Sequence, residues 1–134
     1  MLQGLGAGAM MQAFAGIEAA GQETGTVYQL RVYHTVEGRL PALLKRFREH
    51  AGVIFARHGM TPVAYWVATD EPLKGRTFYY ILKFPSREAA VKSWKAFGED
   101  PEWLRVEKES EVDGKIIEKS ETTYLELTDF SPKV

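Results

Sequence analysis

The spacing of apolar and polar positions changes several times after residue 26, and each change marks a predicted element. Segments that are rich in β-branched and aromatic residues are typical of strands. The expected strands cover residues 27–35, 61–69, 77–84 and 115–128. Residues 69–76, between the second and third strands, carry turn-forming side chains and predict a loop.

Residues 37–58 repeat their apolar positions every three or four residues, which predicts one long amphipathic helix. Gly59 suits the position after its C-terminal end, because glycine adopts a left-handed backbone easily. The apolar stripe consists of Leu40, Leu43, Leu44, Phe47, Ala51, Ile54 and Phe55. The opposite, solvated face is expected to carry Lys45, Arg46, Arg48 and Glu49.

Two more helical segments are expected in the second half of the chain. Ser86 is a suitable N-cap for the first, which places Trp94 and Phe97 on one face and ends at Gly98. Asp100-Pro101 begins the next, with Asp as the cap and Pro in the first turn.

These elements follow the order β-α-β-β-α-β, the split arrangement of ferredoxin-like folds. We therefore expect an α+β domain over residues 27–134, with an antiparallel sheet and its helices on one face. Residues 1–26 contain no Lys or Arg and many Gly and Ala, which predicts a flexible tail or the remnant of an export signal. A truncated twin-arginine signal would indicate a periplasmic protein and a plain tail a cytoplasmic one, so the compartment stays open.

Both faces of the predicted sheet carry large apolar side chains. On the third strand, Phe78 and Tyr80 point to one side, whereas Tyr79 and Ile81 point to the other. The helices can cover one face only, and soluble monomers rarely expose an extended apolar face. We expect a homodimer whose sheets pack face to face. Alternatively, the tails or the end of the fourth strand cover the second face.

Charge and cysteine content exclude several classes of function. The net charge of −1 argues against a nucleic-acid partner, which requires a clustered basic surface. The sequence has no cysteine, so it forms no disulfide, thiolate nucleophile or Cys-based metal site. No segment reaches the roughly 18 apolar residues that a transmembrane helix needs.

Five short motifs, taken in order, resemble the NIPSNAP family over residues 27–132. They are Gln29-Leu30-Arg31-Val32-Tyr33, Arg57-His58-Gly59, Ala64-Tyr65-Trp66, Asp100-Pro101-Glu102-Trp103 and Phe130-Ser131-Pro132. The resemblance implies a dimeric α/β-barrel fold, whose relatives include cofactor-free monooxygenases, isomerases and haem-binding enzymes. It implies no particular reaction, because one fold hosts many chemistries.

His50 is the candidate general acid or base, since it is expected to face the sheet from the middle of the first helix. The alternative is a histidine at the edge of the core, bonded to a tyrosine or a backbone carbonyl. His58 is interpreted as a structural residue at the helix C-terminus. On one helix the two rings would lie ~12 Å apart and cannot share an ion, so we predict no metal and no cofactor.

Arg31 is the second candidate, because a charge inside a strand needs a partner. It is expected either to hold a carboxylate or phosphate of a ligand or to pair with an acid such as Glu126. Tyr33 is expected to join it through its hydroxyl group. The other residues expected to line a pocket between the sheet and the first helix are Tyr65, Trp66 and Tyr80.

Three functions are compatible with this pattern. The first is a dimeric protein that binds a small molecule in this pocket. The second is a cofactor-free oxygenase or isomerase, in which His50 takes a proton and Arg31 or Tyr33 steadies the resulting enolate. The third is a protein-interaction module without a pocket.

Overall fold

The computed structural model describes residues 25–134, and within them an antiparallel four-stranded sheet has the order β2-β3-β1-β4. The strands are β1 (Val27–Thr35), β2 (Thr61–Val67), β3 (Thr77–Phe84) and β4 (Ile117–Leu125). The helices are α2 (Leu40–Arg46), the π-helical segment η2 (Phe47–Ala51), α3 (Gly52–Arg57), α4 (Arg87–Glu99) and α5 (Pro101–Ser110). The predicted α+β class and the order β-α-β-β-α-β are confirmed.

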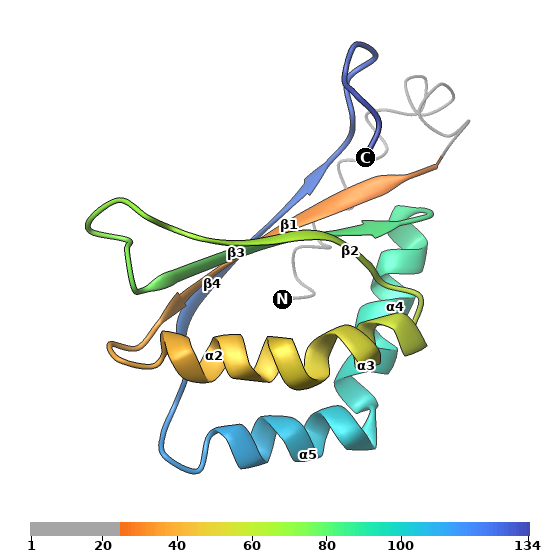
Figure 1. The fold of residues 1–134 in the computed structure, drawn as a ribbon. Helices are drawn as coiled ribbons and strands as arrows, with labels where there is room; N and C mark the ends of the chain where they lie inside the picture. Colours follow the sequence, from red (N-terminus) through yellow and green to blue (C-terminus); the bar gives the residue numbers. More distant parts are fainter. Residues whose placement is uncertain (1–24) are drawn as a thin grey trace.

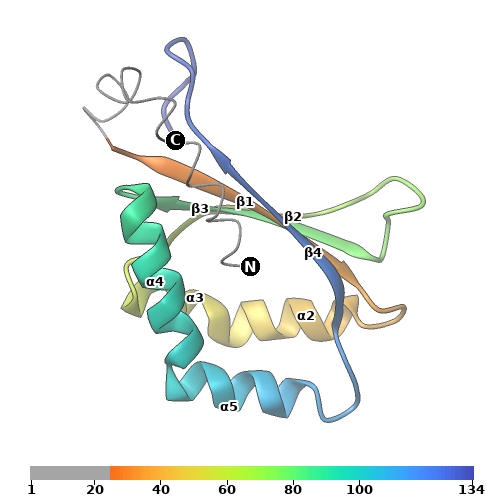
Figure 2. The same ribbon diagram turned by 180° about the vertical axis from the view of Figure 1, so that it is seen from behind.

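The described helices all lie on one side of the sheet, as Figure 1 and the reverse view in Figure 2 show. Helices α2 and α3 run beneath the strands, α4 stands at one end, and α5 runs back under α2. None of these helices is long and apolar enough to cross a membrane. The flexible tail or export-signal remnant predicted over residues 1–26 falls, apart from residues 25 and 26, outside the described residues.

The helix-facing side of the sheet forms the core. Phe78, Tyr80, Leu82 and Phe84 of β3 are buried there, because alternate residues of a strand point to the same face. From the helices, Leu43, Ile54 and Phe55 pack against this layer. The apolar stripe predicted for the first helix is therefore the face that meets the sheet.

The opposite side of the sheet, called the outer face below, is apolar over the middle of β1, β2 and β3 but charged on β4, where Glu121 and Lys119 lie beside Val32 and His34. Leu30 and Val32 of β1 pair with Ile81 and Tyr79 of β3, and all four side chains are half-buried. Trp66 of β2 pairs with Tyr79 and is 47% exposed. The two-faced apolar pattern of the strands is thus present in the structure.

The first helix is not the continuous α-helix that the spacing predicts. It begins at Leu40 and changes to a π-helix over Phe47–Ala51 before α3 begins. Its end does follow the prediction, since Gly59 has φ +73° and the Met60 N–H donates to the Phe55 carbonyl at 3.0 Å. This glycine-terminated end turns the chain toward β2.

Candidate functional site

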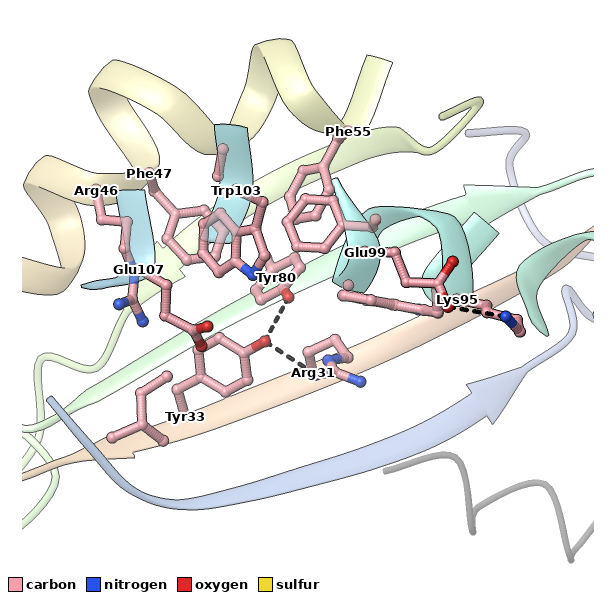
Figure 3. Close-up of a pocket in the computed structure, with 15 residues that line it drawn as sticks. Arg31, Tyr33, Arg46, Phe47, Phe55, Tyr80, Lys95, Glu99, Trp103 and Glu107 are labelled. Carbon is pink, nitrogen blue, oxygen red and sulfur yellow. Dashed lines mark hydrogen bonds and ion pairs between the residues drawn. The ribbon is translucent and has the colours of Figure 1, made fainter. Parts of the chain in front are cut away.

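A cavity of about 450 Å³ lies between the inner face of the sheet and the helices (Figure 3). Aromatic rings from β1, β3, the first helix, α4 and α5 form most of its wall: Tyr33, Phe47, Phe55, Tyr80, Trp94, Phe97 and Trp103. The remaining lining residues are Arg31, Arg46, Ala51, Lys95, Gly98, Glu99, Glu107 and Ile117. The cavity falls in the size range of small-molecule sites, which is about 300–1,000 Å³.

The π-helical segment η2 supplies part of this wall. Its first residue, Phe47, packs its ring 4.7 Å from Phe78 and 5.0 Å from Tyr80, measured between ring centroids. Its last residue, Ala51, is fully buried and lines the cavity. Single π-helical turns within α-helices occur often at functional sites.

The polar floor of the cavity is a chain of hydrogen bonds between neighbouring strands. Arg31 donates from Nη2 to the Tyr33 hydroxyl at 2.9 Å, and this hydroxyl lies 2.8 Å from that of Tyr80. Nη1 of Arg31 donates to Thr122 Oγ1 at 3.1 Å, and the guanidinium lies 4.3 Å from the Trp94 ring centroid. Thr122, and not Glu126, is the β4 residue in register with Arg31.

Burial and hydrogen bonding fix the protonation of this floor. Burial lowers the pKa of Arg31, but the interactions with Tyr33 and Tyr80 outweigh it, and the pKa is raised overall. Burial also raises the pKa of Tyr80 well above its ordinary value. The floor therefore presents a guanidinium cation and a neutral Tyr80 phenol throughout the physiological range.

Arg46 approaches the cavity from the end of α2 and is only 3% exposed. Its Nη1 donates to Ser110 Oγ at 3.0 Å and to Glu111 Oε2 at 3.2 Å, and its guanidinium lies 5.2 Å from the Trp103 ring centroid. The expectation that Arg46 belongs to the solvated face is wrong. It lies on the flank of the apolar stripe, and α5 packs against this flank.

A charged cluster joins the end of α3 to the junction of α4 and α5. Asp100 Oδ2 lies 2.8 Å from Arg57 Nη1 and 2.7 Å from His58 Nε2, while Arg57 Nη2 lies 2.7 Å from Glu102 Oε1. Asp100 Oδ1 caps α5 by accepting the Glu102 N–H at 2.8 Å. The hydrogen bond with His58 is the main reason why the pKa of Asp100 is lowered, and Arg57 adds to it against the opposing effect of burial.

Residues 28–132 match the family model of NIPSNAP. The chain belongs to the NIPSNAP family. Among curated proteins, none matches the chain.

Several solved structures share the fold. A NIPSNAP family protein of Agrobacterium tumefaciens is 26% identical, with a TM-score of 0.68 over 80% of this chain and 97% of the other. An uncharacterized NIPSNAP-like domain protein of Burkholderia xenovorans is 14% identical, with a TM-score of 0.70 over 83% and 92%. SnoaB of Streptomyces nogalater, a cofactor-independent oxygenase, is 13% identical, with a TM-score of 0.51 over 81% and 99%. At this identity, the likeness to SnoaB is one of fold alone.

Two of the NIPSNAP-like motifs meet in space, although the 40 residues 60–99 separate Arg57-His58-Gly59 from Asp100-Pro101-Glu102-Trp103 in the sequence. The charged cluster is this meeting point. It fixes the start of α5, and Trp103 one turn later lines the cavity. His58 is therefore a structural partner of Asp100 in this NIPSNAP chain.

The structure brings Arg31, Tyr33 and Tyr80 together on the cavity floor, whereas His50, Tyr65 and Trp66 are not among the residues that line it. The His50 side chain is 36% exposed and lies 3.9 Å from Glu49, because Ala51 takes the inward position of η2. Tyr65 is on the inner face of the sheet, with its ring centroid 5.7 Å from that of Phe47. Trp66 is on the outer face.

The sequence reasoning missed most of the aromatic wall. The sequence pattern predicts only that Phe47 and Phe55 lie on one apolar stripe and that Trp94 and Phe97 share a helix face, and it gives Trp103 only a place in a motif. One feature of the sequence could have found them. The apolar face of every predicted helix has to pack against the same face of the sheet, so aromatic residues on these faces are expected to lie close together. Within residues 25–134, no group of three or more His, Cys, Asp or Glu side chains is arranged to hold a metal ion.

Proposed function

We propose that this NIPSNAP protein binds a small aromatic molecule with an anionic oxygen group, and that the cavity is its binding site. The observation that carries the proposal is the pairing of a buried guanidinium with a wall of aromatic rings. A cavity without a function is normally filled by side chains, since protein interiors pack closely. If side chains filled this space, the protein-interaction module without a pocket would be favoured instead.

Arg31 is suited to an oxyanion. Guanidinium offers five N–H donors in a planar fork that fits a carboxylate, and hydrogen bonds to a charged group are among the strongest in proteins. The aromatic walls favour a flat apolar body, because ring pairs gain energy beyond the burial of their area. An aromatic carboxylate or an aromatic enolate has both properties.

A comparison of 2-naphthoate with its neutral isostere naphthalene-2-carboxamide tests this proposal by isothermal titration calorimetry. We expect the carboxylate to bind at least about tenfold more tightly, since one charge-assisted contact is worth about 1.5 kcal/mol or more. Equal binding of the two compounds, or binding of neither, contradicts the proposal.

The enzymatic alternative uses the same floor, since Arg31 and Tyr33 would steady an enolate formed in the cavity. His50 was the predicted base for this reaction, and its position outside the cavity lining gives that role no support. Conversion of an activated aromatic C–H substrate in air, without added cofactor, would favour this alternative over simple binding.

We also propose that two copies of the chain pair through the outer face. Leu30, Val32, Tyr79, Ile81 and Trp66 give this face an apolar centre. Sheet-on-sheet contact of a normal interface size, about 1,600 Å² in total, would remove these side chains from water. A two-fold axis brings the same apolar patch of each copy together.

Changing Ile81 to glutamate should therefore convert a dimer into a monomer, because it places two charges in the centre of the interface. Sedimentation velocity at micromolar concentration measures the outcome. Lys92→Glu, on the exposed surface of α4, is the matched control and should stay dimeric. A wild-type protein that sediments as a monomer contradicts the proposed pairing.

A further inference from the structure

The motif Phe130-Ser131-Pro132 has no part in the cavity, yet Phe130 is 83% exposed, more than any other large apolar side chain among residues 25–134. It lies in a turn that closes where the Ser131 N–H donates to the Thr128 carbonyl at 3.2 Å. Single exposed apolar residues are ordinary, but two more exposed side chains lie in the same C-terminal tail, residues 126–134: Leu127 and Val134. An apolar tail presented in this way is typical of a contact with another protein surface.

The C-terminal tail lies on the outer-face side of the sheet. Its last carbonyl, that of Val134, accepts hydrogen bonds from the Tyr28 hydroxyl and from Lys83 Nζ, each at 3.0 Å. Tyr28 shares the strand face of Leu30, and Lys83 that of Ile81, because alternate residues point to the same side. Figures 1 and 2 show the tail rising from the side of the sheet that the helices leave bare. A second copy that covers the outer face therefore meets this tail.

A groove of about 450 Å³ opens on the outer face beside the loop between β2 and β3. The larger apolar residues that line it are Leu30, Trp66, Val67, Leu73 and Tyr79. The lining also includes Thr69 and Asp70, which are polar. In one copy of the chain, Trp66 is 47% and Leu73 is 38% exposed. The groove is therefore large enough and apolar enough to receive an aromatic side chain.

The tail of one chain lies too far from the groove of the same chain to fill it. The tail leaves the sheet at the end where β1 begins, because Tyr28 pairs with Leu125 of β4. The loop beside the groove is at the other end, where Thr77 of β3 pairs with His34. The six steps from Tyr28 to His34, at about 3.3 Å each, separate the two ends by ~20 Å. A two-fold axis that lies between two face-to-face sheets and runs across their strands overlays opposite ends, so each tail meets the partner's groove.

We propose that Phe130 of the partner subunit inserts into this groove, so that each chain completes the outer face of the other. This inference rests on the proposed pairing and specifies its axis and its anchoring side chain. The insertion removes from water the most exposed aromatic ring of the tail together with Trp66 and Leu73. The charges beside the contact are opposite, since Asp129 is next to the inserted ring and Lys74 is next to Leu73.

Engineered cysteines test the contact directly, because the chain has none of its own. In the variant Phe130→Cys/Leu73→Cys, mild oxidation should link two chains by disulfides, which form only where the two Cα atoms come within about 7 Å. Non-reducing electrophoresis should show a dimer that a reducing agent dissociates. Phe130→Cys/Val53→Cys is the matched control and should give no link, since Val53 is exposed on α3, on the helix side of the sheet.

Phe130→Ser provides a second measurement that needs no cysteine. It should raise the dissociation constant of the dimer at least about tenfold, because each dimer loses two buried rings. Sedimentation velocity across a dilution series measures this constant. Val53→Ser, which removes an exposed apolar side chain from α3, should leave the dissociation constant unchanged.

A dimer that forms no link in the Phe130→Cys/Leu73→Cys variant, and whose dissociation constant is unchanged by Phe130→Ser, overturns the inference while the pairing through the outer face stands. A link between two chains of the Phe130→Cys single variant shows that the tails meet one another, and it likewise overturns the groove as their site. A wild-type protein that sediments as a monomer overturns the pairing itself.

Discussion

Replacing Arg31 with methionine is expected to weaken the binding of 2-naphthoate by about 10- to 150-fold. The variant removes charge-assisted hydrogen bonds worth about 1.5–3 kcal/mol, and each 1.4 kcal/mol is about a factor of ten in affinity. Methionine fills the space beneath Trp94, and the Tyr33 and Tyr80 hydroxyls can still bond to one another. The fold should therefore survive, and circular dichroism checks that it does.

His50→Ala is the matched control for this variant, because His50 is not among the residues lining the cavity. Its affinity for 2-naphthoate should equal that of the wild type. Arg31→Lys should fall between wild type and methionine, because it keeps the charge and loses the planar fork. Wild-type affinity in the methionine variant would show that Arg31 does not hold the carboxylate.

Replacing Asp100 with asparagine should lower the melting temperature at pH 7 by about 5 °C, because the buried carboxylate loses its charge beside His58 and the more exposed Arg57. Asparagine is itself a good N-cap, so the cap of α5 is kept and the interactions with Arg57 and His58 are weakened. Asp100 has a lowered pKa in the folded protein. Its contribution to stability is therefore complete above the unfolded-state pKa of about 3.9 and is lost as the pH falls below that value.

The difference in melting temperature between wild type and Asp100→Asn should accordingly shrink between pH 4 and pH 2, because the unfolded wild type takes up a proton at this carboxyl group while the folded protein resists protonation. Thermal melts across this range measure the difference. Asp113→Asn, at an exposed position after α5, should leave the melting temperature unchanged. A gap that stays constant down to pH 2 would show that Asp100 carries no pH-dependent stability.

The helices and strands could be predicted from the sequence, because each kind of element has a typical spacing or composition of apolar residues. Strands such as β3 are short runs of β-branched and aromatic residues, and the first helix repeats its apolar residues from Leu40 to Phe55, about four turns, so local spacing is sufficient. The π-helical segment could not be predicted this way. It interrupts an otherwise helical run without changing the apolar stripe, in which Ala51 already had an inward position, and His50 beside it is left 36% exposed.

The candidate site was only partly predictable, for reasons that differ between residues. Arg31 and Tyr33 could be found because polar groups on a buried strand face require partners. Trp66 could not belong to the same pocket as Tyr65, since consecutive strand residues point to opposite faces. Arg46 and Glu107 come from different helices, and they line the same cavity only because of the way α2 packs against α5. The spacing of apolar residues does not predict this packing.

A crystal structure of the protein with 2-naphthoate tests the central claim most directly. The account predicts that the naphthalene ring lies among the aromatic side chains of the cavity, with its carboxylate oxygens within hydrogen-bond distance of the Arg31 guanidinium. A naphthoate bound only on the outer face, or a cavity that excludes it at saturating concentration, would contradict the account.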